Sequence, residues 1–118
     1  MIAVVDDDAS VRRSVANLLS SLGLHVTVFD SAESFLAADL ARIECLLLDV
    51  RLPKMSGLEL LEKLRSLAVK LEVVMLTAHD DDETRKRAHA LGVSAFVTKP
   101  FRSEDLVMAI RARTAAAT

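Results

Sequence analysis

Five short apolar runs, each followed by a segment with helical periodicity, constrain the fold of this chain more than any other feature. The runs are rich in leucine or β-branched residues and span residues 2–5, 25–29, 45–48, 73–76 and 95–97. Continuous apolar runs of this length are typical of strands that are buried on both faces of a parallel sheet. The runs therefore predict five buried strands.

Helical patterns fill the intervals between these runs. Apolar residues recur at helical spacing over residues 11–22, 58–68 and 106–110, and the first two faces are expected to include Leu22, Leu67 and Ala68. Capping or acidic residues at 30–33, 80–83 and 103–105 predict the starts of three helices, with Asp30 or Ser31 as one cap. Gly23 and the 91–92 pair are expected to end two helices.

The alternation of strands and helices predicts an α/β fold. Five strands separated by helices require right-handed crossovers, which give a doubly wound parallel sheet with five helices on its two faces. The 118 residues suit one domain, spanning residues 1–118. Residues 112–118 are rich in alanine and leave two readings open, the frayed end of a helix or the start of a linker.

Composition excludes several classes of function. The formal net charge of -2 argues against direct binding of nucleic acid, and the absence of Trp and Tyr argues against base stacking. The single cysteine, Cys45, cannot form an intrachain disulfide and is expected to be a small buried residue. No apolar run is long enough for a membrane helix, and no secretory signal precedes Asp6, so we expect a cytoplasmic protein.

Reactive side chains follow the predicted strands at their carboxyl ends. Because ligands of open α/β sheets bind outside these ends, the side chains are expected to share one rim. They are Asp6, Asp7 and Asp8 after the first strand, Asp49 after the third, Thr77 after the fourth and Lys99 after the fifth.

Carboxylates gathered at one rim repel one another and favour a hard divalent cation among them. The histidines have no ligand spacing with Cys45, which argues against zinc. A metal, a hydroxyl, a lysine and a carboxylate nucleophile together suit phosphoryl transfer through an aspartyl phosphate. Some of the residues have a plainer reading when each is taken alone. They are Asp8 as a helix cap, Asp80, Asp81 and Asp82 as helix N-terminal charge, and Phe96 as core.

Four segments in order carry a resemblance to a known family. They are residues 4–8 (VVDDD), 48–57 (LDVRLPKMSG), 76–78 (LTA) and 99–101 (KPF). Together they closely resemble the receiver domain of bacterial two-component response regulators, over essentially the whole chain. The resemblance implies a flavodoxin-like sheet with strand order 2-1-3-4-5.

The resemblance also implies roles for the rim residues. Asp49 is expected to accept a phosphoryl group from the phosphohistidine of a sensor histidine kinase. Asp7, Asp49 and the backbone carbonyl of Arg51 would ligate Mg²⁺, for which Mn²⁺ could substitute, and Asp6 would reach the ion through water. Lys99 would pair with the phosphoryl oxygens.

A conformational switch follows from the same resemblance. Thr77 is expected to hydrogen-bond the phosphoryl group while Phe96 turns inward, and the Lys99–Pro100 bond is expected to be cis. The face formed by the fourth helix, fifth strand and fifth helix would then repack and form a homodimer or contact an output module. The chain would catalyse only its own phosphorylation and dephosphorylation, and so is not expected to be an enzyme with a separate substrate.

Residues 31–36 and 55–61 are similar to receivers of the FixJ-like branch of LuxR-type transcription regulators, in which a DNA-binding output domain follows the receiver. Three alternatives stay open: a stand-alone phosphoryl carrier, a pseudo-receiver that is never phosphorylated, and a haloacid-dehalogenase-like phosphatase. The last alternative would make Asp6, in the Asp6-x-Asp8 pattern, the phosphorylated residue.

Overall fold

Five parallel strands form one sheet in the order β2-β1-β3-β4-β5, which confirms the predicted α/β fold and strand order. The strands are β1 (Ile2–Val5), β2 (Val26–Phe29), β3 (Cys45–Asp49), β4 (Glu72–Thr77) and β5 (Ala95–Thr98). The computed structural model describes residues 1–78 and 81–117. Strand β2 begins one residue later than predicted, because His25 contributes only its carbonyl to the ladder, accepting from the Ile2 N–H at 2.9 Å.

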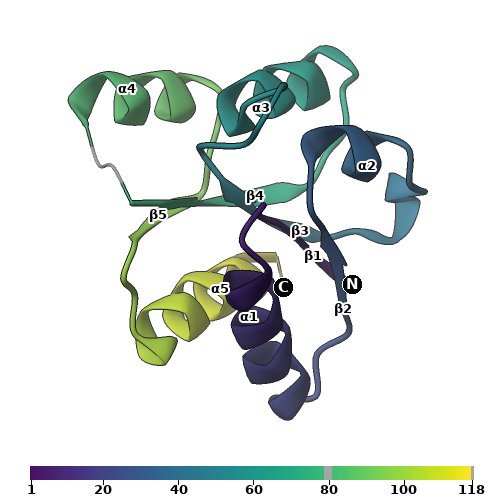
Figure 1. The fold of residues 1–118 in the computed structure, drawn as a ribbon, viewed down its shortest axis with the longest axis vertical. Coiled ribbons are helices and arrows are strands. Elements are labelled where there is room, and N and C mark those ends of the chain that lie inside the picture. The colour runs from purple at the N-terminus through teal and green to yellow at the C-terminus, as the bar shows by residue number, and fades with distance from the viewer. Residues whose placement is uncertain (79–80, 118) are drawn as a thin grey trace.

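The helices cover both faces of the sheet (Figure 1). One face carries α1 (Ala9–Ser21) and α5 (Ser103–Ala117), and the other carries α2 (Ala32–Leu36), α3 (Gly57–Ser66) and α4 (Asp82–Ala90). A short 3-10 helix, η1 (Leu40–Arg42), was not predicted. The backbone of α5 is helical through most of the alanine-rich end. Among the described residues, no helix is both long and apolar enough to cross a membrane.

The sheet separates two apolar clusters, and each central strand supplies both. In β1, Ala3 and Val5 pack with α2 and α3, while Ile2 and Val4 pack with α1 and α5. All four residues of β1 are buried, as are all five of β3, including Cys45. Burial on both faces explains why these runs are continuously apolar instead of alternating.

The predicted helix faces are wrong at their last residues. Leu22 is 41% exposed and Leu67 is 55% exposed, because α1 and α3 end one residue before them. In α3 the Val69 N–H bonds the Leu64 carbonyl and the Ala68 N–H bonds the Arg65 carbonyl, which closes the helix in a Schellman motif. Ala68 adopts a positive φ of 55° in this motif. The equivalent position is a glycine after α1 (Gly23) and after α4 (Gly92).

The N-terminus of α3 lies against the end of β3. Ser56 caps this helix in a capping box with Glu59, and the Gly57 N–H donates to the Val50 carbonyl at 2.9 Å. A Cβ atom on Gly57 would lie 2.1 Å from the backbone oxygen of Asp49 and 2.9 Å from the Val50 Cα. Only glycine therefore permits α3 to pack this closely against the backbone that carries Asp49.

We predict that Gly57→Ala lowers the free energy of unfolding by about 3 kcal/mol, because the added methyl group must displace backbone. The control is Gly23→Ala, where no atom lies within 4 Å of the new Cβ and only the φ of +81° is unfavourable. That variant should lose about 1 kcal/mol. Urea unfolding followed by circular dichroism measures both losses, and an equal loss in the two variants would contradict the packing argument.

Candidate functional site

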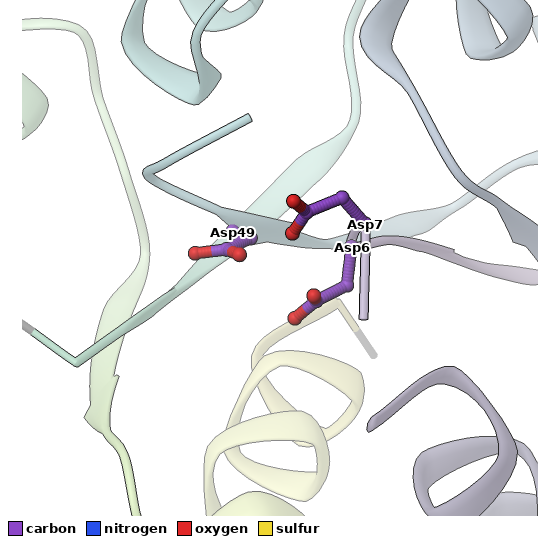
Figure 2. A group of neighbouring side chains, drawn as sticks. All are labelled: Asp6, Asp7 and Asp49. Carbon is purple, nitrogen blue, oxygen red and sulfur yellow. The ribbon is translucent and has the colours of Figure 1, made fainter. Parts of the chain in front are cut away.

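Three carboxylates meet where β1 and β3 end side by side. Val5 pairs with Leu48, so Asp6 and Asp49 follow as neighbours at the carboxyl edge of the sheet. Each of Asp6, Asp7 and Asp49 offers an oxygen atom within 4.8 Å of the others. Figure 2 shows the Asp6 and Asp7 side chains extending from the end of β1 toward the side on which Asp49 lies. The structure thus brings together three of the four acids that the sequence predicted at one rim, and the fourth, Asp8, is not part of this cluster.

Asp6 is completely buried and is held by two charged or polar partners. Its Oδ1 accepts the Asp8 N–H at 2.9 Å, and its Oδ2 accepts from the Lys99 Nζ at 2.7 Å. Asp8 in turn caps α1 by accepting from the N–H groups of Ser10 and Val11, as predicted. Asp6 is therefore a structural anchor of the β1–α1 turn as well as a member of the acid cluster.

A backbone hydrogen bond to β4 positions Lys99. Its N–H donates to the Thr77 carbonyl at 2.7 Å, and the bond to Pro100 is cis. The ammonium group also lies 3.4 Å from the Asp49 Oδ2, so it touches two acids. Burial lowers the pKa of Lys99, but the hydrogen bond to Asp6 and the charge of Asp49 outweigh it, and the net pKa is raised. Lys99 therefore remains a cation in the site.

Asp49 is only 7% exposed, at the base of the acid cluster. Its Oδ1 accepts the Arg51 N–H at 3.2 Å, while its Oδ2 faces Lys99. Burial and the neighbouring Asp6 carboxylate raise the pKa of Asp49 to about 6, against the opposing effect of Lys99. A carboxylate that is desolvated yet partly accessible is suited to act as a nucleophile.

The donor set fits a hard divalent cation. Three carboxylates and one ammonium leave an excess of two negative charges, and carboxylate oxygen is the ligand that Mg²⁺ prefers. Asp7 is exposed, which leaves a side of the cluster open for the water molecules that Mg²⁺ retains. The acid cluster can therefore hold a metal ion.

Thr77 and Phe96 lie on the neighbouring strands β4 and β5. Thr77 is buried at 1% exposure at the end of β4. Phe96 is half-buried in β5, with the Arg85 Cζ 4.9 Å from its ring centroid and the His89 ring centroid at 5.7 Å. Both partners belong to α4, so Phe96 connects this helix to the sheet. Residues His79 and Asp80 lie outside the described residues.

Two contacts near the acids were not predicted. Glu33 follows Asp30 at the spacing of a capping box, but Ser31 caps α2 and the Glu33 Oε2 accepts the Met55 N–H at 3.2 Å. That bond joins α2 to the loop after Asp49. Arg12 donates to the Asp6 carbonyl at 2.8 Å. A side chain that bonds a distant main-chain group leaves no periodic signal, so neither contact could be found from sequence.

Comparison with known proteins agrees with the observed fold. A family model of the response regulator receiver domain matches residues 2–111. The response regulator protein TmoT of Ectopseudomonas mendocina is 42% identical over 113 residues, which are 94% of this chain and 51% of that protein. The transcriptional regulatory protein FixJ of Azorhizobium caulinodans is 42% identical over 110 residues, or 92% of this chain and 52% of that protein.

A solved structure agrees as well. The response regulator receiver protein from Pseudoalteromonas atlantica superposes with a TM-score of 0.91 at 28% identity, covering 99% of this chain and 98% of that one. The chain spans about half the length of the curated relatives that it matches. From the matched family and the acid cluster at the carboxyl edge of the sheet, we conclude that this chain belongs to the response regulator receiver domains and is similar to those of FixJ-like regulators.

Proposed function

We propose that this receiver accepts a phosphoryl group on Asp49 from the phosphohistidine of a sensor histidine kinase. The observation that carries the proposal is the setting of Asp49, whose Oδ2 lies 3.4 Å from the Lys99 Nζ and whose carboxylate shares a 4.8 Å cluster with Asp6 and Asp7. The matched family supports the same reading. The chain acts on itself and has no separate substrate to turn over.

The transfer is a displacement at phosphorus. The Asp49 Oδ2 attacks with an electron pair, the P–N bond to the kinase histidine breaks, and that imidazole leaves after taking up a proton. The Oδ1 is held by the Arg51 N–H, which leaves the Oδ2 as the attacking atom. Lys99 sits beside the Oδ2 and meets the incoming phosphoryl oxygens, whose charge its ammonium offsets.

The metal that best fits the cluster is Mg²⁺, with Mn²⁺ as a substitute. Asp7, Asp49 and the Arg51 carbonyl would hold it, with Asp6 contributing through water because its own oxygens already bind Lys99 and the Asp8 N–H. When bound, the ion neutralises charge on the phosphoryl oxygens. Asp6 keeps Lys99 in place.

The phosphatase alternative would require Asp6 as the nucleophile. Asp6 is completely buried, and each of its carboxylate oxygens already accepts a hydrogen bond. Asp49 retains some exposure and has the weaker contact with Lys99. The contacts of the two acids therefore favour Asp49 as the acceptor.

The output of the switch is proposed to lie on the face formed by α4, β5 and α5. Met108 of α5 is 70% exposed there, beside a hollow lined by Phe96, Val97 and Asp105. Exposed apolar area of this kind is suited to a homodimer or to an output domain. Because the related regulators are about twice as long as this chain, a DNA-binding output module is the proposed partner within a longer protein.

The acceptor assignment predicts that Asp49→Asn reduces phosphoryl labelling by acetyl phosphate and Mg²⁺ to background, because the amide is a poor nucleophile. Mass spectrometry of the labelled wild type should place the modification on Asp49. Asp8→Asn, which alters only the helix cap, is the control that keeps labelling. Retention of the label at Asp6 in Asp49→Asn would support the phosphatase alternative, and a wild type that binds no Mg²⁺ would support the pseudo-receiver.

Metal binding should depend on pH through Asp49. A protonated carboxyl is a poor metal ligand, so with a pKa of about 6 the group competes for protons as the pH falls below 6. The apparent affinity for Mg²⁺ is expected to drop about tenfold between pH 7.5 and pH 5. Isothermal calorimetry across this range measures the affinity without a tryptophan or tyrosine probe. A flat profile would contradict Asp49 as a ligand.

The switch assignment predicts that Thr77→Ala still accepts phosphate but dimerises poorly. Loss of one hydrogen bond to a charged group costs about 2 kcal/mol, which shifts the equilibrium between the two states by more than tenfold. Sedimentation of the phosphorylated variants measures the dimer. The control is Thr27→Ala, because Thr27 lies on β2, at the opposite edge of the sheet from β5 and the proposed dimer face. Equal dimerisation of phosphorylated Thr77→Ala and wild type would disprove the switch role.

A further inference from the structure

The turn between β1 and α1 holds two adjacent acids in different environments, one buried and one exposed. Asp6 is completely buried and faces Lys99, whereas Asp7 is exposed and still brings its carboxylate within 4.8 Å of Asp6 and Asp49. The orientation of the peptide unit that joins the two residues decides where Asp7 points. Whatever fixes that peptide unit also fixes the open side of the acid cluster.

Arg12 bonds that peptide unit directly. Its Nη1 donates to the Asp6 carbonyl oxygen at 2.8 Å, and this carbonyl belongs to the peptide between Asp6 and Asp7. Arg12 is half-buried in the first turns of α1, and its own N–H donates to the Asp8 carbonyl at 3.0 Å. The guanidinium group is thereby anchored to the helix that begins immediately after the acids.

Other bonds hold the flanks of the turn. The Asp8 N–H donates to the Asp6 Oδ1, and the Asp8 side chain caps α1. These contacts fix the Asp6 side chain and the start of the helix. The Arg12 bond restrains the carbonyl of the Asp6–Asp7 peptide itself. The bond from the Asp8 N–H to the Asp6 side chain does not restrain this carbonyl.

We propose that Arg12 is a positioning residue that orients the Asp6–Asp7 peptide so that the Asp7 carboxylate faces Asp49. The inference rests on the proposed function in one respect, namely that the acid cluster binds Mg²⁺. Arg12 acts through the peptide group and does not touch the phosphoryl group or the acceptor.

The sign of the effect separates this role from simple electrostatics. Removing a positive charge near an acid cluster strengthens the attraction for a cation. Loss of the peptide anchor instead lets Asp7 leave its position and weakens binding, as the loss of groups that orient metal ligands generally does. Arg12→Ala and Arg13→Ala remove the same charge from adjacent residues of α1, and Arg13 is exposed. The two variants are therefore a matched pair.

The experiment titrates the wild-type chain of 118 residues and its variants Arg12→Ala, Arg13→Ala and Arg12→Lys with Mg²⁺ by isothermal calorimetry at pH 7.5. Arg12→Ala should bind about tenfold more weakly than wild type. Arg13→Ala should equal wild type or bind slightly more tightly. Arg12→Lys, which keeps a charge and a donor, should fall between wild type and Arg12→Ala and replaces the alanine variant if the latter does not fold.

A second measurement needs no metal. The Asp7 amide resonance of the metal-free protein should move in Arg12→Ala and stay in place in Arg13→Ala. Unchanged resonances, or Mg²⁺ affinity in Arg12→Ala equal to or above that of Arg13→Ala, would overturn the positioning role. If wild type binds no Mg²⁺, the proposed metal site fails, and the amide resonance still decides whether Arg12 orients the turn.

Discussion

Mutual repulsion among three carboxylates is the constraint on which the rest of the site depends. Asp6, Asp7 and Asp49 offer oxygens within 4.8 Å of one another, an arrangement that costs free energy unless positive charge is supplied. The fold supplies part of it through Lys99, 2.7 Å from Asp6 and 3.4 Å from Asp49. A cation from solution could supply the remainder, and relief of this repulsion would favour its binding.

The scaffold that holds these acids differs from the helix proposed to respond to them. Strands β1 and β3 are buried at every residue, which makes the positions of Asp6 and Asp49 costly to move. Only Ala88 is fully buried among the residues of α4. Polar contacts also hold this helix and its end, among them Arg87 with Glu62 at 2.6 Å and Arg65 with the Leu91 carbonyl at 2.7 Å. Such contacts can be exchanged at a lower cost than apolar packing.

Local sequence patterns predicted the alternation of strands and helices, because strand ends and helix caps depend on neighbouring residues. They also predicted that the acids lie at the carboxyl edge of the sheet. Asp8 caps α1 and Asp81 caps α4, in agreement with their plainer readings. The helix ends at Leu22 and Leu67 were predicted too late, because apolar spacing does not show where a Schellman motif ends a helix. Glu33 and Arg12 each bond a backbone group that comes near only when the chain folds, so these contacts could not be predicted from the sequence. The same holds for Gly57, whose packing against Asp49 is a tertiary constraint.

The ion pair between Asp6 and Lys99 joins residues 93 positions apart, one at the end of the first strand and the other just after the last. A chain emerging from the ribosome therefore exposes its acids long before it possesses the lysine that completes them. Non-local contacts of this kind slow folding, because closing a long loop costs conformational entropy before the contact is made. The proposed uptake of a phosphoryl group would thus depend on the last strand of the sheet, and a fragment that lacks β5 and the residues after it would also lack Lys99.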